Sequence, residues 1–150
     1  MSIEVLMAAP EDLARFERIA PDVFDNPVEP DLLMSFLRAP HQHLAVACAR
    51  DLLVGMASGV MYHHPDKPRE LFLNEVGVSA TWQRQGIARR LLRTLLDAGR
   101  AQGAQVAWVL TEADNLPACA LYEALDGQRE GNDLVMFTFD LHVQPRARLA

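Results

Sequence analysis

Cysteine is scarce in this sequence, which holds only Cys48 and Cys119 among 150 residues. Small secreted domains that rely on disulfides carry more cysteines, and structural zinc sites usually carry them in pairs at C-x-x-C spacing. Neither pattern is present. We therefore expect no disulfide framework and no metal, and so few cysteines suit a reducing compartment.

Long apolar runs are missing as well. No stretch approaches the roughly 20 apolar residues that a helix needs to cross a bilayer. The opening residues, MSIEVLMAAPEDL, lack the basic segment that begins a secretory signal and soon turn acidic. We expect a cytoplasmic protein with no membrane partner.

Basic residues are outnumbered. The chain has 14 lysines and arginines against 20 aspartates and glutamates, which gives a net charge of −6. Nucleic-acid binding depends on neutralising phosphates with Lys and Arg, so this balance argues against such a partner and favours a cationic one. The basic residues gather at 84–93 and in a short tail, which we expect to fray from about residue 142.

Hydrophobic periodicity predicts one mixed α/β domain over residues 1–150, with the order β-α-α-β-β-β-α-β-α-β-β. A strand, helix and strand in succession after residue 70 imply a parallel crossover. The expected strands are 3–8, the arms of a hairpin within 43–64 that turns at Arg50-Asp51, a central strand at 71–78, a buried strand at 104–112, and 134–141 after a hairpin turn at 129–134; the expected helices are 10–24, 29–40, one from Ile87 to about Gly103, and 115–127.

The helix that begins at Ile87 has arginines at the wrong end. Its N-terminus carries about half a positive charge, so acidic residues are usual there. Gly86 lets another group approach the backbone, and the first amides of a helix are free to donate. These features favour a phosphate or pyrophosphate site. Arginines on a solvated surface beside a tolerated glycine explain the composition equally well.

Residues Gln83–Ala88, QRQGIA, fit the Q/R-x-x-G-x-G/A signature of the GNAT superfamily of acyl-CoA-dependent N-acetyltransferases. The stretch EVGVSATWQRQGIARRLL resembles that family's central strand and pyrophosphate helix, and TEADNLPACALYEALDG resembles a later helix. The element order resembles the family from residue 3 to about 141. More loosely, HPDKPRELFLNEVGV and VMFTFDL resemble the type I aminoglycoside 3-N-acetyltransferases.

The resemblance implies a GNAT fold, acetyl-CoA as the cosubstrate, and a role for each matching position. The strand end would hold the pantetheine arm, the signature amides would hold the pyrophosphate, and Arg89 can reach a phosphate. Asn115 matches a pantetheine contact, although helix capping alone would explain it. The implied cofactor residues are Val76, Gly77, Val78, Gln83, Arg84, Gln85, Gly86, Ile87, Ala88, Arg89 and Asn115.

Tyr122 matches the family tyrosine that protonates the departing thiolate. A tyrosine hydroxyl with its ordinary pKa near 10 stays protonated at neutral pH and can act as a general acid. Packing at the edge of the core is the commoner use of a tyrosine on an amphipathic helix. The motif around Tyr122 favours the catalytic role.

Glu75 is a charged residue within an otherwise apolar strand. Carboxylates are seldom buried unless they are paired or functional. Glu75 can accept the proton that an ammonium group must lose, or bind a cationic substrate electrostatically. An ion pair with Arg69, Lys67 or another basic residue is the structural alternative.

We therefore expect an enzyme that transfers acetyl directly to a primary amine, with both substrates held in one ternary complex. The expected partner is a small cationic amine, aminoglycoside-like or polyamine-like, and a homodimer is a candidate assembly. A peptide N-terminus or a lysine is the alternative acceptor. An acyl-CoA-binding module without turnover is the alternative of another class.

Overall fold

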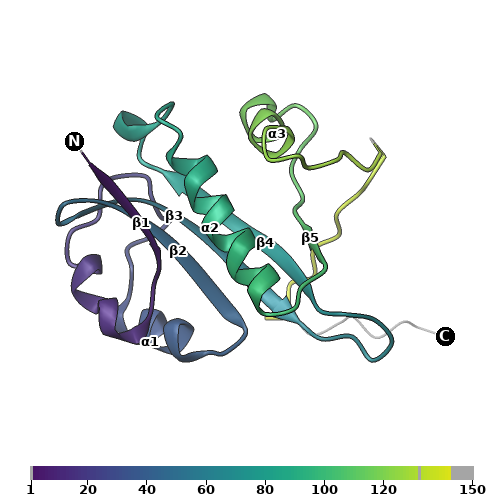
Figure 1. Cartoon of the computed structure of the whole chain (residues 1–150), viewed down its shortest axis with the longest axis horizontal. Coiled ribbons are helices and arrows are strands. Elements are labelled where there is room, and N and C mark those ends of the chain that lie inside the picture. Colours follow the sequence, from purple (N-terminus) through teal and green to yellow (C-terminus); the bar gives the residue numbers. More distant parts are fainter. Residues whose placement is uncertain (1, 132, 143–150) are drawn as a thin grey trace.

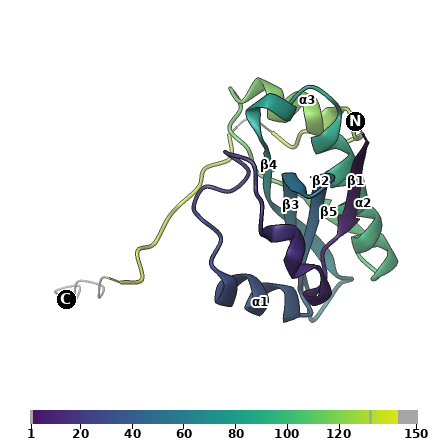
Figure 2. The same ribbon diagram turned by 90° about the vertical axis from the view of Figure 1, so that its left-hand side faces the viewer.

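The computed structural model describes residues 2–131 and 133–142. A five-stranded sheet in the order β1-β2-β3-β4-β5 forms its centre. Helix α2 lies across one face (Figure 1), and η1 and α1 lie on the other side (Figure 2). The strands are β1 (Ile3–Met7), β2 (Gln42–Ala49), β3 (Leu52–Tyr62), β4 (Glu70–Val78) and β5 (Val106–Trp108); the helices are the 3₁₀ helices η1 (Pro10–Phe16) and η2 (Ala80–Trp82) and the α-helices α1 (Pro30–Arg38), α2 (Ile87–Ala101) and α3 (Leu116–Glu123).

The strand pairing confirms two predictions. β2 and β3 form the expected antiparallel hairpin around Arg50-Asp51, where Arg50 takes the left-handed conformation that so short a turn requires. β4 pairs with β5 in parallel, as the crossover through α2 predicts. β4 is flanked by β3 and β5, which agrees with its prediction as a central strand.

Helix α2 supplies much of the core. The helix predicted from Ile87 is confirmed, and its apolar stripe of Ile87, Leu91, Leu92 and Leu95 is buried against the sheet. Each such side chain stabilises the fold by roughly 1.5–3 kcal/mol relative to an exposed one. The stripe therefore holds the start of α2 firmly against the sheet.

The predicted helix at 10–24 is wrong in type and length. The structure has a 3₁₀ helix that ends at Phe16. Beyond it the backbone pairs with β3 instead: Leu53 N–H donates to the Arg18 carbonyl, and Ala20 N–H donates to the Leu53 carbonyl, both at 2.9 Å. These groups therefore cannot make helical bonds, and residues 20–29 become a loop.

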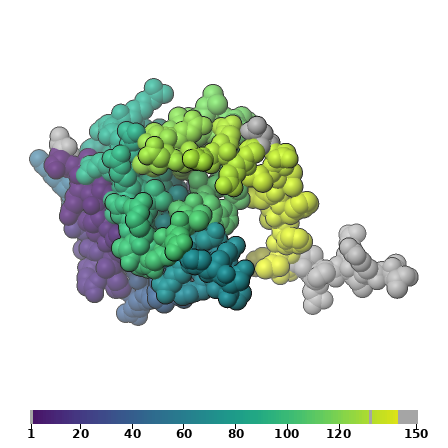
Figure 3. Space-filling model, turned by 45° about the vertical axis from the view of Figure 1, so that its right-hand side comes forward, coloured from purple at the N-terminus to yellow at the C-terminus, as the bar shows by residue number. Residues whose placement is uncertain are grey.

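The predicted last strand is also wrong. Residues 134–141 form no strand, and six of their large apolar side chains are 69–92% exposed. The segment (yellow) stands off from the main body (Figure 3). The ladder bonds that stabilise a strand are therefore missing. The hairpin turn predicted at 129–134 has no strand on either side in the described residues, and Asn132 and the residues after 142 lie outside them.

The strand predicted at 104–112 is shorter and more open than expected. β5 has three residues, and the side chains of Val106 and Trp108 are 51% and 38% exposed. Pairing with β4 covers one edge of β5, while no strand among the described residues covers the other.

Within the described residues, no helix is long and apolar enough to cross a membrane.

Gly77 allows the 20–29 loop to pack on β4. A Cβ atom at this position would lie 2.3 Å from the carbonyl oxygen of Val23, closer than atoms can approach. The loop therefore reaches the strand only because residue 77 has no side chain. This contact fixes where Asp22 and Asp25, on either side of Val23–Phe24, lie relative to β4.

We predict that Gly77→Ala lowers the free energy of unfolding by about 1–3 kcal/mol, because the loop must move away from the added methyl group. Urea unfolding measures the change. Gly55→Ala is the matched control, since its Cβ would meet no atom closer than 3.2 Å and two of its three neighbours are side-chain ends. An equal loss in both variants would contradict the proposed contact.

Candidate active site

One extra residue in β4 determines the direction of its side chains. The ladder between β3 and β4 shifts at this point: Ser58 pairs with Glu75 but Gly59 pairs with Leu73, so Asn74 forms a β-bulge. Leu71 faces α2, and Gly77 faces Val23 on the opposite side. The bulge therefore turns Glu75 and Gly77 away from α2.

A small cavity of about 200 Å³ lies on this side of β4 and is rich in carboxylates. Asp22 and Asp25 come from the loop between η1 and α1, and Glu75 comes from the bulge. None of the three carboxylates forms an ion pair in the part of the chain that the structure describes. Three unpaired acids around one cavity create a strong local preference for a cation. The remaining lining residues are Val23, Met56, Val76 and Gly77.

Glu75 does not have the partners that an ion-pair role requires. Its residue is exposed, and the guanidinium of Arg69 donates instead to the carbonyl of Gln102 at 3.0 Å. The structural alternative from the sequence is therefore not observed within the described residues. Asp22 and Asp25 were not predicted as site residues from the sequence, because the expected helix at 10–24 and the loop after it gave no reason to place them near Glu75.

The loop between β4 and α2 has an unusual backbone. Arg84 and Gly86 both have positive φ angles, +60° and +76°, and a side chain at Arg84 makes that conformation costly. The side chain of Gln83 donates to the carbonyl of Val78 at 3.0 Å, which closes the loop over the strand end. Strain retained at a loop of this kind is a mark of a functional site.

The start of α2 offers free donors and no negative charge. The amides of Arg84, Gln85 and Gly86 donate to no backbone carbonyl in the described chain, and no acidic residue lies in the first turn. The first amides of the helix, beginning at Ile87 and Ala88, have no partner by helix geometry. A Cβ added to Gly86 would meet no protein atom within 4 Å. These features suit an anion that approaches the backbone closely.

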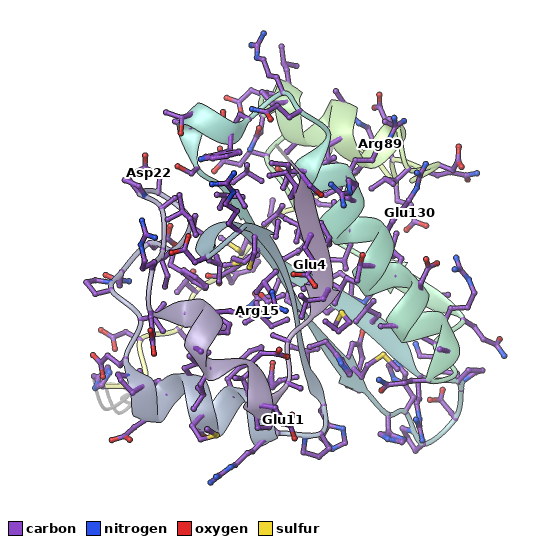
Figure 4. All side chains as sticks on the ribbon, turned by 60° about the vertical axis from the view of Figure 1, so that its left-hand side comes forward. Glu4, Glu11, Arg15, Asp22, Arg89 and Glu130 are labelled. Carbon is purple, nitrogen blue, oxygen red and sulfur yellow. The ribbon has the colours of Figure 1, made fainter. Side chains whose placement is uncertain are left out.

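Two of the arginines hold the structure together. Arg89 donates to the carbonyl of Ala124 at 3.0 Å and ties α2 to the end of α3, and Arg90 donates to the carbonyl of Ile3 at 2.7 Å. Figure 4 shows Arg89 on the side of the molecule opposite Asp22. Arg84 and Arg93 form no ion pair among the described residues. Arg89 and Arg90 therefore have structural roles, while Arg84 and Arg93 remain available to bind a ligand.

Helix α3, which carries Tyr122, ends beside the start of α2 (Figure 1), where Arg89 donates to the Ala124 carbonyl. The Asn115 side chain accepts a bond from the Ala118 amide at 3.2 Å, which confirms its prediction as the N-cap. Tyr122 is half-buried, and burial raises the pKa of its hydroxyl, with a smaller contribution from Cys119. The hydroxyl therefore stays protonated well above neutral pH.

The described residues contain no group of three His, Cys, Asp or Glu side chains that could hold a metal.

Comparison with known proteins gives a consistent family. The model of the acetyltransferase (GNAT) family matches residues 10–127. N-alpha-acetyltransferase RimI of Mycobacterium tuberculosis is 37% identical over 109 residues, which cover 73% of this chain and 66% of that protein. Probable N-acetyltransferase family 8 member 5 of Mus musculus is 34% identical over 67% of this chain and 44% of its own length. The chain thus spans less than two thirds of these curated relatives.

Solved structures resemble the fold. An aminoglycoside acetyltransferase from an uncultured soil metagenomic sample superposes with a TM-score of 0.77 at 23% identity, over 94% of this chain and 99% of that one. Aminoglycoside acetyltransferase AAC(6')-Iy, solved with a CoA-containing bisubstrate analogue, gives a TM-score of 0.75 at 18% identity, over 93% and 99%. At such identities the likeness is one of fold.

We predict that Gly86→Glu weakens CoA binding at least about tenfold, because it adds bulk and negative charge where the free amides converge. Isothermal titration with CoA measures the change. Gly103→Glu is the matched control, since Gly103 also has a positive φ angle and open space but lies at the other end of α2. Equal affinity of Gly86→Glu and the unaltered protein would place the anion elsewhere.

Proposed function

The chain belongs to the acetyltransferase (GNAT) family, and on that premise we propose that it transfers acetyl from acetyl-CoA to a primary amine of a small cationic acceptor. Acetyl-CoA supplies the acetyl group as an activated thioester. The single observation that carries the acceptor class is the cavity at the β4 bulge, lined by three carboxylates without ion-pair partners in the described chain. Such a cavity attracts an ammonium group.

The cofactor residues fit a pyrophosphate. The unpartnered amides of Arg84, Gln85 and Gly86, and those at the first turn of α2, would hold it, with Arg84 supplying positive charge. Val76, Gly77 and Val78 would border the pantetheine arm through their backbone. In this structure the Val78 carbonyl already accepts the Gln83 side chain, which leaves its second lone pair for a ligand.

The proposed acceptor residues line the cavity beside the same part of β4, which also includes Val76 and Gly77. Glu75 would accept a proton from the ammonium group or hold it by charge, and Asp22 and Asp25 would hold further positive charge. Tyr122 would donate its proton to the departing sulfur, since its raised pKa keeps the hydroxyl protonated at working pH. Holding both reactants at one strand end supplies the alignment that a direct transfer needs.

A peptide N-terminus is the second candidate acceptor. It is favoured by the 37% identity to a relative whose name is N-alpha-acetyltransferase. A peptide amine also carries positive charge, but it brings only one such charge to three carboxylates. The acyl-CoA-binding module without turnover remains the alternative of another class, and it requires neither Tyr122 nor the acidic cavity.

Thiol release from acetyl-CoA, followed across a panel of amines, tests the function. We expect polycationic small amines to stimulate release more than peptides that begin with alanine. The double variant Asp22→Asn, Asp25→Asn should raise KM for these amines about three- to tenfold, because two exposed charges beside the acceptor are lost, and should leave kcat nearly unchanged.

Asp97→Asn is the control, since Asp97 lies on the exposed outer face of α2 and pairs with Arg100. Its kinetic constants should match those of the unaltered protein. Release that is stimulated by peptides alone would support the second candidate. CoA binding with no amine-stimulated release at all would support the module and refute the enzyme.

We predict that Tyr122→Phe lowers kcat about a hundredfold, the usual contribution of a general acid, and changes CoA affinity less than about twofold. Single-turnover rates and CoA titration give the two values. Helix α3 should stay folded, because the backbone carbonyl of residue 122 that accepts the Gly127 amide is retained. Weaker CoA binding with intact turnover would show that Tyr122 binds the cofactor and does not act as the acid.

A further inference from the structure

A chain of hydrogen bonds fixes Trp108 on the sheet. The Trp108 indole Nε1 donates to the Tyr62 hydroxyl oxygen at 2.7 Å, and the Tyr62 hydroxyl donates to Glu70 Oε2 at 3.0 Å. His64 Nε2 lies 2.6 Å from the same carboxylate oxygen. The bonds from His64 and Tyr62 hold the pKa of Glu70 below its usual range, so this carboxylate is charged. The indole therefore has one preferred orientation.

Trp108 and Phe72 pack against each other on the same face of the sheet. Their ring centroids are 4.6 Å apart with a tilt of 36°. The Trp108 residue is 38% exposed although its only polar atom already has a partner. Phe72 covers part of the indole from one side, and the exposed remainder of this immobilised ring is a surface on which another ring can stack with little loss of side-chain entropy.

The pair of Trp108 and Phe72 lies beside the acidic cavity on the same face. Phe72 pairs with Val60, and Glu75 pairs with Ser58, so the two residues lie on neighbouring positions of the face turned away from α2. Two residues along β3 correspond to roughly 7 Å. A molecule of one or two rings that places an amine at Glu75 would therefore extend over Phe72 and Trp108. At the far end, Tyr62 and Glu70 also face this side.

We propose that the exposed indole of Trp108, backed by Phe72, forms a stacking subsite that selects acceptors built on saturated rings with amino substituents; this proposal rests on the proposed function and deepens it. The apolar face of such a ring packs on the indole, and its ammonium groups interact with the aromatic faces and with the carboxylates at both ends. A linear polyamine satisfies the carboxylates but gains little from a flat surface. A peptide's aromatic side chain gains from the surface but brings no charge.

Steady-state kinetics with two polycationic amines test the subsite. Trp108→Ala should raise KM for a 2-deoxystreptamine aminoglycoside about three- to tenfold, with kcat changed less than twofold, and should leave KM for spermidine unchanged. Trp108→Phe keeps a flat ring and should restore most of the lost affinity. Equal increases for both amines, or no increase for the aminoglycoside, would overturn the subsite. Melting temperatures of the variants check that β5 remains folded.

A binding measurement separates this proposal from the proposed function. The sequence has two tryptophans, so in a Trp82→Phe background the intrinsic fluorescence reports on Trp108 alone. Titration with the aminoglycoside should change that emission, and spermidine should change it much less. An emission change without acetyl transfer would support the subsite and refute the enzyme. Acetyl transfer to the aminoglycoside with no emission change would refute the subsite and leave the enzyme standing, and absence of both would refute both.

Discussion

The site depends on one bulged residue in β4. Leu71 and Leu73 face α2, and strict alternation would turn Glu75 to the same side, beneath the helix. A carboxylate there would be buried without a partner, at a cost of several kcal/mol. The extra residue, Asn74, reverses the alternation, so that Glu75 reaches the carboxylate cavity and Gly77 meets the loop that carries Asp22. One irregular pair thus creates the acidic face.

The same strand end separates two opposite charges. The unpartnered amides at the start of α2 favour an anion, while the three carboxylates around the cavity favour a cation. Both sites are held by packing: Ile87 and Leu91 fix the start of α2, and the Val23 carbonyl fixes the loop against Gly77. The same packing contacts therefore fix the backbone around both proposed sites.

Much of the fold was predictable because its signals are local and repeated. The stripe of Leu91, Leu92 and Leu95 specifies α2 by spacing alone, and Asn115 specifies the start of α3 by capping. The helix at 10–24 was not predictable in this way, since it is shortened by hydrogen bonds to Leu53, far away in sequence. The last strand failed similarly: alternation in 134–141 predicts strand propensity, but a strand also needs a paired neighbour.

The candidate site likewise contains residues that local sequence signals predict and residues that only long-range contacts bring together. Gly86 and the arginines were visible in the sequence because they lie together in it, although the structure divides the arginines between carbonyl contacts and open surface. Glu75 was visible as a charge among apolar residues. Its companions were not, because the contact that brings Asp22 and Asp25 to it is made by a glycine and a backbone oxygen. Side-chain patterns in a sequence do not reveal a cavity that is assembled through backbone contacts. In this sequence only the charge of Glu75 within an apolar strand indicated that a site was present.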